Sequence, residues 1–110
     1  MSGVSKLKAP FACDLTAIPA AERATHQQVT RRLVAAVADF HESGEGFSLR
    51  LSADEYETVT QFVARERLCC PFLKFVVVVT PERGTIDLRP SGPVGAKELI
   101  RAELHLPSPA

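Results

Sequence analysis

The sequence has no excess of either charge. Its 110 residues include 13 Lys and Arg against 13 Asp and Glu, which gives a formal net charge of zero. Neither sign is gathered into a long block, so the chain lacks the basic surface that nucleic acids and anionic membranes attract. We therefore expect no nucleic-acid partner.

Long apolar runs are also missing. Residues 1–10 contain Lys6 and Lys8 but no apolar stretch that would serve as a signal-peptide core, and no other segment is long enough to span a bilayer. From these absences we expect a cytoplasmic protein without membrane contact. In that compartment three cysteines, an odd count, favour free thiols, metal ligands or redox groups over a disulfide framework.

Motifs of well-known thiol and metal enzymes are absent as well. The chain contains no Cys-x-x-Cys spacing, no His-Glu-x-x-His, and no His-x-Glu with Pro-Cys-x-x-Cys. Thiol-disulfide oxidoreductases, zinc metalloproteases and zinc deaminases are therefore not indicated.

The residues that are present predict one domain. With 45% hydrophobic residues, the chain can bury a single modest core. We expect a flexible arm at 1–9, one domain over 10–106 and a loose tail at 107–110.

Hydrophobic periodicity predicts seven elements within that domain. They are a strand near 11–15, a helix at 20–40, a strand at 47–51, a helix at 53–69, strands at 72–80 and 85–89, and a last helix that begins at 91–93 and ends near 106. The apolar, β-branched run at 72–80 is typical of a central strand. The order β-α-β-α-β-β-α favours an α+β two-layer sandwich, with the helices on one face of a mainly antiparallel sheet.

The adjacent pair Cys69 and Cys70 lies where the second long helix must end, because Pro71 disfavours helical geometry at the residue before it. Glu66 continues the apolar stripe of that helix, and a carboxylate in a buried register needs a partner. A bound metal, a nearby cation or an Arg from another element would each supply one. Packing as small hydrophobes is the simplest role for single cysteines.

Three thiolates gathered from two elements would form a soft metal site. Cys13 is expected on the inward face of the first strand, so it is the candidate third ligand beside Cys69 and Cys70. Three thiolates suit mercuric ion, trivalent arsenic or cuprous copper, whereas a fourth ligand from His26 or Glu66 would suit zinc. For His26, an ordinary capped or solvated role remains an alternative.

Unaided nucleophilic chemistry is less favoured at this position. The negative end of the helix dipole and the Glu66 carboxylate both raise the pKa of a thiol at a helix C-terminus. A bound metal reverses this effect, because coordination deprotonates a thiol.

Several segments together are similar to those of a known group of proteins. These segments are Glu66-x-x-Cys69-Cys70-Pro71-Phe72 with Phe75, Ser91-Gly92-Pro93-x-Gly95-x-Lys97, Cys13 before Leu15-Thr16-Ala17, and Arg23-x-x-His26. On these residues the chain resembles small, largely uncharacterised bacterial proteins with a Glu-x-x-Cys-Cys-Pro-Phe motif, often associated with heavy-metal resistance. The resemblance implies that Cys13, Glu66, Cys69, Cys70 and His26 are the positions to test.

Three functions follow as hypotheses. The first is a soft-metal or metalloid-binding protein that uses three cysteines in sequestration, delivery or detoxification. The second is a metal-thiolate or thiol-redox enzyme at the same site, with Glu66 as its catalytic candidate and a concave pocket beside it. The third is an interaction module with structural cysteines. Because the strand at 75–79 is apolar on both sides, we expect a homodimer under each hypothesis.

Overall fold

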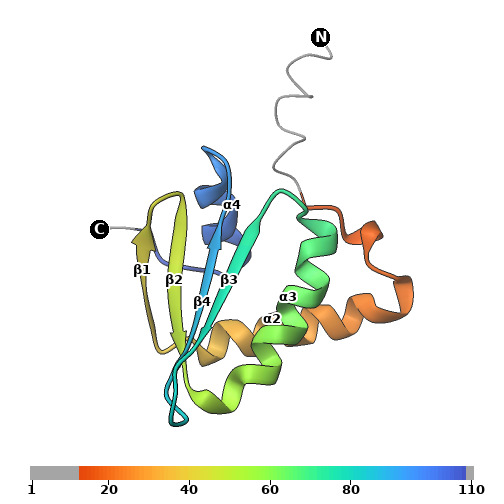
Figure 1. Ribbon diagram of the computed structural model, residues 1–110. Coiled ribbons are helices and arrows are strands. Elements are labelled where there is room, and N and C mark those ends of the chain that lie inside the picture. Colours follow the sequence, from red (N-terminus) through yellow and green to blue (C-terminus); the bar gives the residue numbers. More distant parts are fainter. Residues whose placement is uncertain (1–12, 109–110) are drawn as a thin grey trace.

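The structure, a computed structural model, describes residues 13–108 (Figure 1). Its elements in chain order are η2 Leu15–Ala17, η3 Ala20–Glu22, α2 Arg23–Ala36, β1 Asp39–Ser43, β2 Gly46–Leu51, η4 Ala53–Glu55, α3 Tyr56–Cys69, β3 Lys74–Val79, β4 Ile86–Ser91 and α4 Ala96–Glu103. Within the described residues, no helix is long and apolar enough to cross a membrane.

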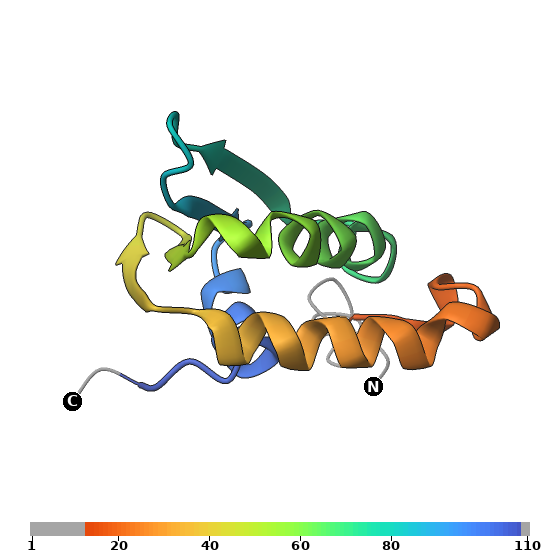
Figure 2. The same ribbon diagram turned by 90° about the horizontal axis from the view of Figure 1, so that it is seen from below.

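The four strands form one antiparallel sheet in the order β1-β2-β4-β3. The helices gather on one face of it, and α2 runs alongside α3 (Figures 1 and 2). The predicted α+β sandwich is confirmed, with the element order α-β-β-α-β-β-α.

Alternation along the inner strands builds the core. Phe47, Leu49 and Leu51 of β2 are buried, as are Ile86 and Leu88 of β4, because every second side chain of a strand points to the same face. The helices contribute further buried side chains to this cluster, namely Leu33, Val59, Phe62, Ile100 and Leu104.

The predicted first strand is wrong over the residues that the structure describes. Phe11 lies outside them, Leu15 begins the 3-10 turn η2, and its side chain is 44% exposed. The Asp14 carboxylate accepts the backbone N–H of Thr16 at 3.0 Å. This local hydrogen bond competes with extended backbone and turns the chain.

The helix predicted at 20–40 is shorter than expected. It begins as α2 after the turn η3, and it ends at Ala36 because Val37 is extended, with φ −65° and ψ 119°. Residues 39–43 instead form β1, whose Phe40 pairs with Leu49. A two-residue turn with Gly44 at φ +55° closes this hairpin. The hydrogen bonds between β1 and β2 therefore decide the structure of residues 39–43, although their apolar spacing also fits a helix.

The hairpin of β3 and β4 is confirmed, but the predicted central position of the first of its strands is wrong. β4 pairs with both β2 and β3, which leaves β3 at the edge. The last helix also differs from expectation. It begins at Ala96 after Gly95 at φ +97° and ends at Glu103, because His105 adopts φ +55°.

Candidate metal centre

The C-terminal end of α3 supplies three of the candidate ligands. Val59, Phe62, Glu66 and Cys69 are all buried, as residues three and four apart share one helix face. Glu66 therefore does lie on the buried stripe. The helix ends at Cys69, and the Cys70 N–H still donates to the Glu66 carbonyl at 2.8 Å. The predicted end of the helix at the cysteine pair is confirmed.

The segment before α2 brings Cys13 to this helix end. The Asp14 N–H donates to the Cys69 carbonyl at 2.9 Å. Ile18 is fully buried beside Cys69 and Cys70, and its carbonyl accepts from Arg23 Nε at 3.0 Å. Backbone pairing, one aliphatic anchor and one Arg thus hold the turn in place.

The three sulfur atoms meet at this point. Cys13 and Cys70 lie at disulfide-bonding distance, with Cα atoms 4.8 Å apart. Cys69 is free and buried, and its Sγ lies 3.8 Å from that of Cys70. The adjacent cysteines therefore do not bond to each other, and Cys70 pairs across 57 residues of sequence instead.

Glu66 completes a compact group of donors. The ligand atoms of Cys13, Glu66, Cys69 and Cys70 all lie within 4.8 Å of one another. Glu66 Oε2 is 3.3 Å from Cys70 Sγ, and Oε1 is 3.6 Å from Cys69 Sγ. In the disulfide form Cys70 has no proton to donate, so the first of these is a close contact that becomes a hydrogen bond on reduction. Three sulfurs and one carboxylate are a donor set that fits a thiophilic ion.

His26 contacts the carboxylate and lies outside this four-residue group. Its Nε2 donates to Glu66 Oε1 at 2.8 Å, and its ring stacks on Phe62 with centroids 5.7 Å apart. The arrangement resembles the outer partners that orient metal ligands in other proteins. His26 is 3% exposed, and its Nδ1 is buried without a hydrogen-bond partner.

Glu103 of α4 is a site residue that our sequence reasoning missed. Burial, a hydrogen bond to Glu66 and repulsion by the Glu66 charge raise the pKa of Glu103 to about 8. It is therefore protonated at neutral pH and donates its proton to Glu66. Its spacing in the sequence could have indicated its burial, because Glu103 lies three residues after Ile100 and one before Leu104, and both of these are buried.

The other two titrating groups respond to the same burial. Burial raises the pKa of Glu66, but hydrogen bonds from His26 and Glu103 outweigh it, so the pKa of this carboxyl is lowered overall. Burial and the Glu66 charge raise the pKa of the Cys69 thiol to about 12. The predicted rise in the pKa of this thiol is confirmed for Cys69, with burial as its largest cause and Glu66 as the next.

A cavity of about 380 Å³ opens beside the cluster. Its lining side chains include a thiol, two carboxyls and an imidazole, and they are Leu15, His26, Gln27, Thr30, Arg31, Glu66, Cys69 and Glu103. The concave pocket beside Glu66 that the enzyme hypothesis requires is therefore present.

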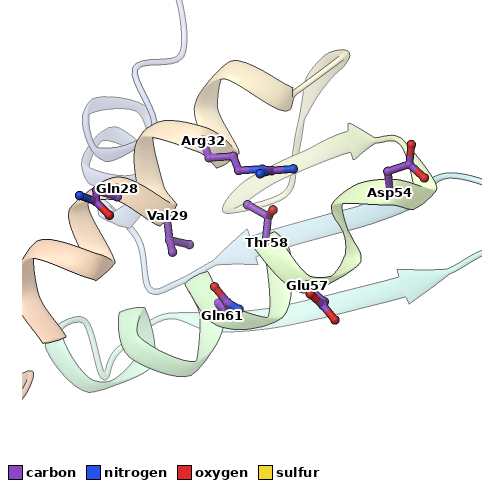
Figure 3. Close-up of a pocket in the computed structure, with 7 residues that line it drawn as sticks. All are labelled: Gln28, Val29, Arg32, Asp54, Glu57, Thr58 and Gln61. Carbon is purple, nitrogen blue, oxygen red and sulfur yellow. The ribbon is translucent and has the colours of Figure 1, made fainter.

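A second depression of about 300 Å³ lies between α2 and α3 (Figure 3). Its lining is mostly polar and includes no thiol, with Gln28, Val29 and Arg32 from α2 facing Thr58 and Gln61 from α3. Arg32 is already paired with Glu55 at 3.2 Å. The reactive side chains thus belong to the cavity beside Cys69.

Comparison with known proteins adds no relative, since no family model, curated protein or solved structure matches this chain.

Proposed function

We propose that the reduced protein binds one thiophilic metal or metalloid ion through Cys13, Cys69 and Cys70. The observation that carries this proposal is the convergence of the three sulfurs and the Glu66 carboxylate within 4.8 Å. Residues 13 and 69 are far apart in sequence, and the core does not require sulfur at this point. A thiophilic ion would explain why all three cysteines of the chain meet there.

The sulfurs of Cys13 and Cys70 can either form a disulfide with each other or bind the ion, but not both at once. A disulfide sulfur carries no thiolate, so the oxidised chain offers only Cys69 as a soft ligand. Thiolates are the form that binds metal. Ion binding by this chain therefore requires prior reduction.

The donor set restricts the class of ion. Three thiolates alone favour mercuric ion, arsenite or cuprous ion, and Glu66 as a fourth ligand would favour zinc. The resemblance to proteins associated with heavy-metal resistance supports the first group, and with it a role in sequestration, delivery or detoxification in the cytoplasm.

The test is a titration of the reduced protein with mercuric, arsenite, cuprous and zinc ions in turn, against a competing chelator. We expect one ion per chain, and a loss of affinity of at least about 100-fold in Cys69→Ser and Cys70→Ser, because each removes one of three thiolate ligands. The oxidised protein serves as a control and should not bind. Equal binding by the wild type and both variants would contradict the proposal and favour structural cysteines.

A thiol-redox enzyme is the second candidate. It is favoured by the free Cys69 sulfur, 3.8 Å from the Cys70 sulfur, and by the adjoining cavity. In such a reaction a substrate dithiol would reduce the Cys13–Cys70 disulfide, two electrons passing to the protein as the substrate forms its own disulfide. Oxidation of one dithiol substrate per oxidised chain, with release of the Cys13 and Cys70 thiols, would support this function over ion binding if Cys70→Ser abolishes it.

We also propose that a second copy of the chain pairs with the edge strand β3. The other edge, β1, carries Asp39, His41 and Glu42, the kind of charge that protects a sheet edge. β3 has only Lys74 at its start, and Val79 is 56% exposed. Antiparallel pairing of two β3 strands would satisfy both edges symmetrically.

Sedimentation analysis tests this pairing. We expect a dimer for the wild type and a monomer for Val76→Lys, with His41→Lys on the β1 edge as the matched control. A wild-type monomer at micromolar concentration would contradict it.

A further inference from the structure

The cavity beside Cys69 points to the chemical form in which the ion arrives. We infer that it receives the ion as a complex with a small thiol that carries a carboxylate, and that Arg31 binds this carboxylate. The inference rests on the proposed function and adds the donor molecule to it.

The three sulfurs are reached from the cavity through only one of them. Cys69 lines the cavity, whereas Cys13 and Cys70 do not. Cys69 is also the sulfur that is not in the disulfide. An incoming complex in the cavity would therefore meet Cys69 first.

The size and chemistry of the cavity suit a small polar molecule. Its volume of about 380 Å³ lies at the lower end of the range of about 300–1,000 Å³ for small-molecule pockets. His26 lines it and is 97% buried, with Nδ1 unpartnered. A buried polar atom without a partner is rare in native proteins, and a bound polar ligand would satisfy it.

The charges around the cavity favour an anionic group on one side only. Arg31 lines it and forms no ion pair within residues 13–108. A planar guanidinium binds a carboxylate through two parallel hydrogen bonds. Glu66 also lines the cavity, but its carboxylate already accepts a hydrogen bond from His26 Nε2 at 2.8 Å.

Transfer would proceed by ligand exchange with no change of oxidation state. The Cys69 sulfur forms a bond to the ion while one bond from the ion to the small thiol breaks, and the Cys69 proton leaves on the released thiol. Cys70 and Cys13 then displace the remaining small thiol in the same way, and each passes its proton to solvent or to that thiol. The product is the three-thiolate ion and free small thiols.

The experiment compares three mercuric complexes as donors to the reduced protein, each in the same excess of its own thiol. The thiols are mercaptoacetate, which is anionic, mercaptoethanol, which is neutral, and cysteamine, which is cationic. The formation of the mercury–thiolate absorption band is followed by stopped flow. We expect transfer from the anionic complex to be about fivefold faster than from the neutral one, the effect of one exposed ion pair.

Arg31→Gln should abolish that preference and leave the final amount of bound mercury unchanged. The matched control is Arg67→Gln, which removes an Arg of α3 that does not line the cavity and should keep the preference. Equal rates from all three donors in the wild type, or a preference that survives Arg31→Gln, would overturn the inference while the proposed function stands. Failure to bind mercury from any donor would overturn both.

Discussion

Two buried clusters of this protein differ sharply in what they bury. The cluster between the sheet and the helices is built of apolar side chains, with Leu49 and Leu88 fully buried, and its polar neighbours are Arg101 over Phe47 and His26 on Phe62. The cluster at the end of α3 has one fully buried aliphatic side chain, Ile18, beside the cysteines. An ionised carboxylate and a histidine lie against it.

The two clusters differ in how much they stabilise the folded chain. Apolar burial stabilises a domain directly, whereas a buried charge pair costs desolvation and is often no more stable than apolar side chains of the same volume. The buried group of Glu66, His26 and Glu103 therefore adds less to stability than apolar side chains of the same volume would, which agrees with the proposed ion site. The first cluster maintains the fold, and the second is the candidate metal site.

Truncation in the first cluster should have the largest effect on stability. Leu49→Ala removes a fully buried side chain from an inner strand, and we expect the free energy of unfolding to fall by about 3–5 kcal/mol. Denaturant unfolding measures this loss. The number of ions bound per folded chain should not change. A variant that stays folded but no longer binds the ion would contradict the separation of the two clusters.

Reduction of the disulfide should have the next largest effect. The bond closes a loop of 57 residues, for which the chain-entropy relation gives about 4 kcal/mol. Denaturant unfolding of the oxidised and reduced proteins gives the difference. Cys69→Ser is the control, because it should retain the same difference. Equal stability of the two forms would show that Cys13 and Cys70 are not joined in the oxidised protein.

Removal of the imidazole should come third. His26→Ala leaves the buried Glu66 carboxylate without its strongest partner, and we expect a loss of about 3 kcal/mol in the free energy of unfolding. Adding Glu66→Gln should recover most of it, since no buried charge then remains. Arg65→Ala, which breaks an exposed pair with Glu22, should cost less than about 1 kcal/mol. A His26→Ala variant as stable as that control would contradict the coupling.

The pH dependence of stability should follow the protonation of Glu103. Between about pH 4.5 and 8 the folded chain keeps the Glu103 proton that the unfolded chain releases, because the folded pKa is raised to about 8. The free energy of unfolding should therefore fall as pH rises across this interval. Glu103→Gln should remove the fall. The Glu66 carboxyl contributes with the opposite sign, because its pKa is lowered in the folded chain. Its stabilisation is fully present above the ordinary pKa of a glutamate and is lost as the pH falls below that value. An unchanged profile in Glu103→Gln would show that this carboxyl does not hold the proton.

Sequence reasoning identified most of this architecture because its signals are periodic. The buried stripe through Val59, Phe62 and Glu66 could be predicted from spacing alone, and the helix end could be predicted from Pro71. The failures are tertiary. Phe40 fits both a helical stripe and a strand, and only pairing with β2 decides between them.

The candidate site could be predicted in part for the same reason. Glu66, Cys69 and Cys70 share one helix end, so local geometry brings them together. The meeting of Cys13 with Cys70 depends on a turn capped by Asp14, and the contact of Glu103 depends on how α4 packs. Neither is encoded in a local pattern strong enough to specify the partner.

The most direct test of the three-sulfur site is X-ray absorption at the mercury edge of the reduced protein, loaded with one mercuric ion per chain. We predict a first coordination shell of three sulfur atoms, which falls to two in Cys13→Ser. A shell of two sulfurs in the wild type, unchanged by that substitution, would contradict the claim that Cys13 completes the site.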